Sequence, residues 1–88
     1  MSIKITIGQL LQRFTENQET VEVSGKTVRD CLEDLIRKFP DIRQYLFDRN
    51  GILMVMIMLN GVTILQKGLN KKISDGDELS IIHMVGGG

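Results

Sequence analysis

The sequence contains few of the residues from which metal and catalytic sites are usually built. Its 88 residues include one cysteine and one histidine, and no tryptophan. A lone cysteine excludes an internal disulfide, and with one histidine it cannot supply the four ligands of a structural zinc site. We therefore expect no bound metal. This cysteine usage suits a reducing compartment, and we predict a cytoplasmic protein.

The chain also has no excess of positive or negative charge and no long apolar run. Eleven Lys and Arg residues balance eleven Asp and Glu residues, so the chain has no broad attraction for nucleic acid or an anionic membrane. The longest apolar run, over 52–59, is far shorter than the ~20 residues that span a bilayer. We predict that the protein binds neither nucleic acid nor membrane.

The length and the apolar pattern predict one compact domain. With 42% hydrophobic residues the chain can bury one core, but it is too short for two cores with a catalytic cleft between them. Isoleucines alternate with polar residues over 3–7, and valines do the same over 21–23. This alternation predicts two strands, joined as a hairpin by an irregular segment over 9–19.

A helix is predicted to follow this hairpin. Thr27 is a candidate N-cap, and Asp30 three positions later supplies a variant of the capping box. Pro40 ends the helix because it disfavours helical backbone at the preceding residue. A short helical turn over 41–47 is expected to pack Ile42, Leu46 or Phe47 under the sheet. The apolar stripe comprises Val28, Leu32, Leu35, Ile36 and Phe39, and the solvent side comprises Arg29, Glu33, Asp34, Arg37 and Lys38.

Three more strands are predicted in the second half of the chain. The turn signals Asn50-Gly51 and Asn60-Gly61 frame a strand over 52–59. In this strand Val55 and Ile57 face the helix, and the methionines point the other way. The pattern then predicts a strand over 62–65, a polar loop over 68–72, a turn over 74–77, a last strand over 78–85 and a tail of three glycines.

The resulting order is strand, strand, helix, strand, strand, strand. It predicts an α+β fold with a mixed sheet and one main helix packed across it. This is the β-grasp, or ubiquitin-like, arrangement, in which the first and last strands lie parallel at the centre of the sheet. We predict a β-grasp domain over residues 1–85 and a flexible C-terminal glycine tail over residues 86–88.

In three segments the chain resembles the MoaD/ThiS family of ubiquitin-like sulfur carriers. The resemblance covers nearly the whole chain, and its specificity comes from the combination of segments. They are the Asn60-Gly61 turn, the Ser74-Asp75-Gly76-Asp77-Glu78 turn, and the ending Ile81-Ile82-His83-Met84-Val85-Gly86-Gly87-Gly88.

The resemblance implies a carrier or substrate protein, not an enzyme. Its reactive group is the terminal carboxylate of Gly88, which a ubiquitin-activating-like adenylyltransferase adenylates with ATP and which is then converted to a thiocarboxylate. Gly86 and Gly87 form the thin leader that threads into the partner, since glycine allows close backbone approach. The carrier itself binds no cofactor, and a sulfur-accepting synthase is the second partner. The family resemblance also allows a stable complex with that synthase.

The globular body is expected to provide a docking surface, because ordering each tail residue costs roughly 1–2 kcal/mol. Met54, Met56 and Met58 are candidates, since thioether side chains adapt to several partners, although such methionines can equally be filler in the core. His83 and Met84 are further candidates for contact with the activating partner. His83 can equally be an exposed strand residue without such a role.

Two other groups are predicted to be structural. Cys31 lies near the edge of the apolar helix stripe and is expected to be a small buried hydrophobe. The acidic turn of Asp75, Asp77 and Glu78 has a spacing unsuited to a metal, and Gly76 meets the turn's demand for positive φ.

The sequence leaves several alternatives open. The sulfur acceptor can belong to molybdopterin, thiamin or cysteine biosynthesis, because the His83-Met84 ending resembles the thiamin branch whereas the length resembles the other two. The rival functions are a protein modifier, joined through Gly88 to lysines of targets, and a β-grasp interaction module whose glycines are incidental.

Overall fold

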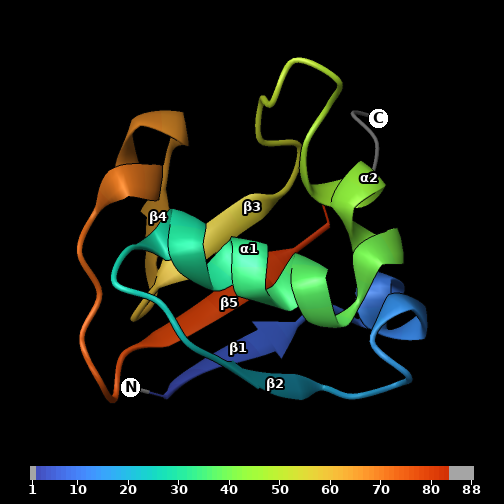
Figure 1. Cartoon of the computed structure of the whole chain (residues 1–88), viewed down its shortest axis with the longest axis horizontal. Coiled ribbons are helices and arrows are strands. Elements are labelled where there is room, and N and C mark those ends of the chain that lie inside the picture. Colours follow the sequence, from blue (N-terminus) through green and yellow to red (C-terminus); the bar gives the residue numbers. More distant parts are fainter. Residues whose placement is uncertain (1, 84–88) are drawn as a thin grey trace.

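The computed structural model describes residues 2–83, which form a five-stranded mixed sheet with helices on one face (Figure 1). The strands lie in the order β2-β1-β5-β3-β4. In chain order the elements are β1 (Ile3–Ile7), η1 (Gln9–Phe14), β2 (Thr20–Val23), α1 (Val28–Lys38), η2 (Pro40–Ile42), α2 (Arg43–Leu46), β3 (Met56–Leu59), β4 (Val62–Ile64), η3 (Gln66–Asn70) and β5 (Glu78–Ile82), where η denotes a 3₁₀ helix.

The first and last strands are neighbours at the centre of the sheet. β1 and β5 run parallel, with Ile5 opposite Leu79 and Ile7 opposite Ile81. β2 pairs antiparallel with β1, and β3 pairs antiparallel with both β5 and β4. This confirms the predicted β-grasp fold. The predicted domain boundary at residue 85 lies outside the described residues.

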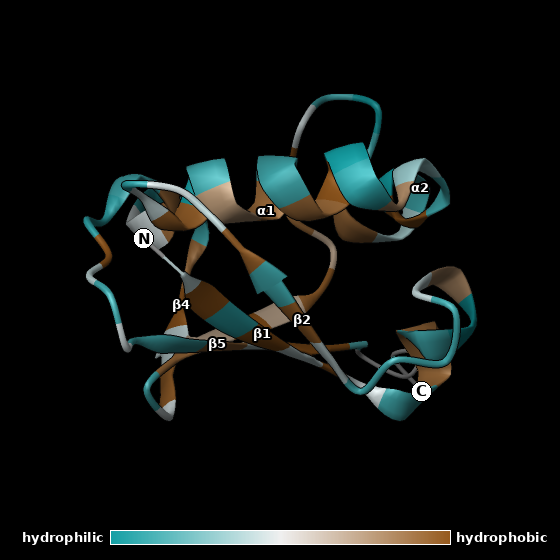
Figure 2. Ribbon diagram, turned by 60° about the horizontal axis from the view of Figure 1, so that its bottom comes forward, coloured by the Kyte–Doolittle hydropathy of each residue, from teal (hydrophilic) through white to brown (hydrophobic). Residues whose placement is uncertain are grey.

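α1 lies across one face of the sheet and buries its apolar side against it (Figure 2). The helix begins as predicted, because the Thr27 side chain accepts a hydrogen bond of 3.1 Å from the backbone N–H of Asp30. Cys31 is fully buried in the core, as expected. Ile42 and Leu46 are buried too, which confirms that the segment after Pro40 packs into the core.

Two segments expected to be irregular contain 3₁₀ helices. The segment over 9–19 contains η1, which buries Leu11, and the polar loop expected over 68–72 overlaps η3, which buries Leu69. In both cases one leucine is fully covered, and a short helical turn directs it into the core. The expectation of wholly irregular segments was therefore wrong, because runs this short carry too few apolar residues for a strong periodic pattern.

The strand expected over 52–59 is half as long as predicted. β3 includes only Met56–Leu59, and its alternation is as predicted, with Val55 and Ile57 buried and Met56 and Met58 half-buried. Residues 52–55 lie outside the strand because their backbone groups bond elsewhere. The N–H of Leu53 donates to the Gln66 side chain and that of Met54 to the carbonyl of Leu46.

Asp34 was assigned to the solvent side of the helix, and this is wrong. Its exposed fraction is 8%, because α1 packs against β2 through this residue. One carboxylate oxygen accepts a hydrogen bond of 3.0 Å from the N–H of Ser24, and the other lies next to Arg37 at 2.6 Å. Asp34 thus joins the helix to the loop after β2 and completes a contact between two elements.

Candidate functional site

The direction of β5 gives the sheet two unlike ends. We call the end where β5 begins, with Asn60 and the Ser74–Glu78 turn, the turn end. We call the end where β5 stops, with His83 and η1, the tail end. Leu59 lies opposite Leu79 and Met56 opposite Ile82, so β3 runs from the tail end to the turn end.

The turn end is closed by hydrogen bonds between its own residues. The Asn60 side chain donates to Asp77 at 3.1 Å and accepts from the N–H of Glu78 at 2.9 Å. Asp77 also accepts from the N–H of Ser74 at 2.7 Å. The hydrogen bonds that Asp77 accepts from Ser74 and from Asn60 hold its pKa below the ordinary value. Gly76 has φ +92°, as the turn requires.

Asp75, a second acid of this turn, also has a structural partner. Asp75 accepts a hydrogen bond of 3.0 Å from the N–H of Ser2, which fixes the start of β1 beside the turn. Within residues 2–83 no group of three or more His, Cys, Asp or Glu side chains is arranged to hold a metal ion. The acidic turn therefore has the structural role expected from its sequence.

The tail end begins with a close approach between two chain segments. The N–H of Gly8 donates to the carbonyl of Ile81 at 2.8 Å. A Cβ atom at position 8 would lie 2.9 Å from that oxygen, so glycine is needed here. His83 follows β5 directly and is half-buried. Its Nδ1 atom is buried and has no hydrogen-bond partner in the part of the chain that the structure describes.

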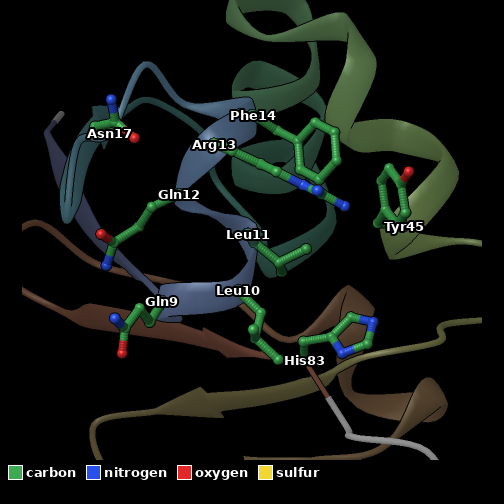
Figure 3. A pocket seen from close by; sticks show the side chains of 9 residues that line it. All are labelled: Gln9, Leu10, Leu11, Gln12, Arg13, Phe14, Asn17, Tyr45 and His83. Atoms are coloured by element: carbon green, nitrogen blue, oxygen red, sulfur yellow. The ribbon is translucent and has the colours of Figure 1, made fainter.

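A pocket of about 580 Å³ opens at the tail end (Figure 3). η1 provides much of its lining, α2 contributes Tyr45, and His83 completes it. Figure 3 shows Leu10 extending toward His83, whose ring is directed away from it, and Arg13 alongside the ring of Phe14. None of its nine lining residues carries a carboxylate.

An aromatic pair gives this pocket a fixed wall. The rings of Phe14 and Tyr45 stack with centroids 4.3 Å apart, and the guanidinium carbon of Arg13 lies 4.9 Å from the Phe14 centroid. Stacking and cation–π contact hold these side chains in place. The ion pairs formed among residues 2–83 involve Asp34 and Glu33 and do not include Arg13.

Two of the predicted docking residues, Met56 and Met58, lie on the face of the sheet away from α1 and are half-buried in β3. Met54 precedes the strand, and 41% of its surface is exposed. Met56 lies opposite Ile82, which is 42% exposed, so these two side chains form an apolar pair near the tail end. The predicted residues Met84, Gly86, Gly87 and Gly88 lie outside the described residues.

Cys31 is unsuited to covalent chemistry. Burial, followed by the nearby carboxylates of Asp30 and Asp34, raises the pKa of its thiol to about 11. The thiol is therefore protonated at neutral pH, and only a thiolate is an effective nucleophile.

The sequence prediction missed four residues of the tail end, namely Leu10, Arg13, Phe14 and Tyr45. One signal was present, because Leu10 and Phe14 are spaced by four and Leu11 and Phe14 by three, as on one side of a helical turn. The contact with Tyr45 joins segments far apart in the sequence, and no local pattern predicts it.

Comparison with known proteins decides the family. The model of the ThiS family matches residues 5–88. The chain belongs to the ThiS family. This confirms the resemblance to MoaD/ThiS sulfur carriers, and the ThiS-family match covers both the turn end and the tail end described above.

The similar proteins include carriers of known structure. Sulfur carrier protein CysO of Mycobacterium tuberculosis is 31% identical, and the alignment covers 100% of both chains. CysO in the Amycolatopsis orientalis BexX/CysO complex is 26% identical, with a TM-score of 0.85 over 98% of this chain and 99% of that one. Small archaeal modifier protein 1 (SAMP1) from Methanosarcina acetivorans is 27% identical, with a TM-score of 0.86 over 99% of this chain and 96% of that one.

The family sets the class of function. This ThiS-family protein is a sulfur carrier, and as such a substrate for other enzymes and not a catalyst. A relative forms a complex with a partner protein, as the BexX/CysO structure shows. No helix within residues 2–83 is long and apolar enough to cross a membrane.

Proposed function

We propose that the carboxylate of Gly88 is the sulfur-carrying group. The observation that carries this proposal is the position of β5, a central strand whose last residue, Ile82, is followed by His83 and five residues up to Gly88. The family match extends to Gly88, and the alignment with CysO covers both chains completely. A strand paired on both sides gives the following segment a firm base.

The proposed chemistry takes place in two steps, adenylation of the carboxylate and displacement of AMP by sulfur. A partner adenylyltransferase, related to ubiquitin-activating enzymes, binds ATP. An oxygen of the Gly88 carboxylate attacks the α-phosphorus, and the bond to pyrophosphate breaks. Sulfide, at the oxidation level of HS⁻, then attacks the carbonyl carbon and displaces AMP, which leaves a thiocarboxylate without any change of oxidation state. The carrier itself holds no cofactor, and it supplies the carboxylate and the surfaces that position it.

Gly86 and Gly87 are proposed to thread into the partner. Residues without a Cβ fit a narrow channel and let the carboxylate reach a phosphate inside another protein. Only His83 and the carboxylate can carry charge between Leu79 and Gly88, so entering the channel requires little desolvation of charge. On this proposal the body over 1–85 docks on the partner and the tail over 86–88 enters its channel. We propose a cytoplasmic location for the protein.

The outer face of the sheet is proposed to dock partners. Met56 and Met58 lie there, with Met56 opposite Ile82, and Met54 precedes the strand. In the sequence His83 and Met84 follow Ile82 toward the tail. Partly exposed apolar side chains near the end of β5 can supply the binding energy that offsets the ordering of the tail. The second partner is a sulfur-accepting synthase, which serves cysteine, molybdopterin or thiamin biosynthesis and can form a stable complex with the carrier.

ATP–pyrophosphate exchange with the host's adenylyltransferase tests the proposal. The unaltered chain should support exchange, whereas a variant lacking Gly88 or carrying one alanine after it should not. An added residue moves the carboxylate by up to ~3.3–3.6 Å, beyond attack distance. Thermal unfolding of each variant provides the control for folding. Full exchange by the alanine-extended variant would show that the Gly88 carboxylate is not the reactive group.

A protein modifier is the second candidate function, favoured by the similarity to SAMP1. In that case the activated Gly88 carboxylate would form an isopeptide bond with a lysine of a target protein. Intact-mass measurement on protein from the native host separates the two. Replacement of one oxygen by sulfur supports the carrier, lysine adducts support the modifier, and an unmodified chain would leave only the interaction module.

A further inference from the structure

We propose that the tail-end pocket binds a loop of the adenylating partner that carries a carboxylate beside an apolar side chain. Arg13 would pair with the carboxylate, and Leu10 and Tyr45 would contact the apolar group. This inference rests on the proposed function and adds to it a second docking site, separate from the methionines on the outer face of the sheet.

The charge of the pocket selects an anionic partner. The whole chain balances acids and bases, but none of the described residues that line the pocket is acidic, and Arg13 is among them. Arg13 takes part in none of the ion pairs formed within residues 2–83. Its guanidinium is oriented by Phe14, 4.9 Å away, so its donors are available without further ordering.

The apolar part of the pocket favours a protein loop over a small anion. Leu10 is 57% exposed and lines the same pocket as the stacked rings of Phe14 and Tyr45. Tyr and Arg are enriched among the residues that contribute most of the binding energy in protein interfaces, and here they lie in one pocket with an exposed apolar side chain. A small anion would leave this apolar surface in water.

An unsatisfied atom of the pocket lining points the same way. Nδ1 of His83 is buried and has no hydrogen-bond partner among residues 2–83. Such atoms are uncommon in native proteins and call for an explanation. Because Nδ1 is covered in the free chain, a group of the partner loop can bond to it only if the His83 ring turns toward the pocket on docking.

The position of the pocket identifies which partner uses it. His83 lines the pocket, and five residues separate it from Gly88. Five extended residues reach at most about 17–18 Å. A protein that holds the Gly88 carboxylate at its ATP site must therefore lie over the tail end, where a loop beside its channel can enter the pocket.

Charge reversal at Arg13 tests the inference. Arg13→Glu should raise the KM for the carrier in ATP–pyrophosphate exchange at least tenfold, with kcat unchanged, because the variant loses docking and keeps its carboxylate. Arg13→Lys should give an intermediate KM. Lys67→Glu, in η3, is the matched control: it makes the same change of charge on an exposed residue away from the pocket and should leave KM unaltered.

Leu10→Ser provides a second variant that leaves charge unchanged. It should also raise KM, and it should not lower the unfolding temperature, because Leu10 is mostly exposed. Equal KM values for Arg13→Glu, Leu10→Ser and Lys67→Glu would overturn the pocket proposal while the exchange by the unaltered chain still upheld the proposed function. Absence of exchange by the unaltered chain would overturn both.

Two titrations distinguish other occupants. Nuclear magnetic resonance signals of Tyr45 and Arg13 should be unchanged when residues 84–88 are deleted or when AMP is added. They should shift when the adenylating partner is added. A shift on deletion would assign the pocket to the chain's own tail, and a shift with AMP would assign it to a nucleotide phosphate; either result would overturn the proposal.

Discussion

The two ends of the sheet differ in how many of their polar and charged side chains have partners within the chain. At the turn end, the side chains of Asn60 and Asp77 bond to each other and to the backbone of the turn. At the tail end, Arg13 has no acidic partner in the described part of the chain, and Leu10 faces solvent. The polar side chains of Asn60 and Asp77 thus have partners within the chain, whereas Arg13 has no ion-pair partner among residues 2–83.

This difference separates residues that maintain the fold from residues that serve binding. Both ends carry polar and charged side chains, and exposure does not distinguish them. What distinguishes them is whether each donor and acceptor already has a partner within the chain. Substitutions at the turn end should therefore reduce stability and leave adenylation intact, and substitutions at the tail end should do the opposite.

Asn60→Ala should give the largest loss of stability among these tests, about 2–3 kcal/mol. Asn60 has φ +50°, a conformation that costs alanine about 1–2 kcal/mol, and the side-chain hydrogen bonds would be lost as well. Thermal unfolding measures the loss. Asn60→Gly keeps the conformation and should lose less. A fall in exchange at a temperature where the variant is folded would refute the separation of the two ends.

Asp34→Ala should cost about 1–2 kcal/mol at neutral pH, because the N–H of Ser24 would lose its acceptor. The effect should depend on pH. Burial alone would raise the pKa of Asp34, but the Ser24 hydrogen bond, Lys38 and Arg37 together hold it below its ordinary value. A lowered folded-state pKa contributes stability that is present above the unfolded pKa of about 3.9 and is lost as pH falls through the folded value.

Urea unfolding of both proteins at pH 7 and at pH 3 checks this. The difference between the unaltered chain and Asp34→Ala should shrink at the lower pH, because Asp34 is then partly protonated in the unfolded chain. A constant difference for Asp34→Ala would mean that its carboxylate charge contributes nothing.

Tyr45→Ala should reduce stability by only about 0.5–1.5 kcal/mol, since Tyr45 is half-buried and its main aromatic contact is the stack with Phe14. Its effect on docking should be larger, with a raised KM in ATP–pyrophosphate exchange. Tyr45→Phe keeps the stacked ring and should behave like the unaltered chain. Loss of stability without any change in KM would place Tyr45 with the structural residues.

Cys31 should show the smallest functional effect. Its thiol has a pKa of about 11 and is fully buried, so a thiol reagent such as DTNB should react with it only after unfolding. Cys31→Ala should form as much Gly88 thiocarboxylate as the unaltered chain. Rapid reaction of the native protein with DTNB would contradict the buried position.

The sequence predicted the turn end better than the tail end, for a physical reason. Asn60-Gly61, Gly76 and the Thr27 cap are local devices whose conformations depend on residues a few positions apart. The pocket depends on contacts between η1, α2 and His83, which only the folded chain brings together. The buried Asp34 was missed likewise, because its burial results from packing against β2 and not from the helical period.

The central pairing of β1 with β5 has a consequence for how the protein is made. Lys4 pairs with Glu78, so the sheet cannot close until β5 has left the ribosome. Until then β1 and β2 form a hairpin with one open edge, which has little stability of its own. A chain terminated early would thus present its carboxylate on an unfolded body without docking surfaces, where proteases act. The topology therefore ensures that chains lacking β5 do not form a stable domain.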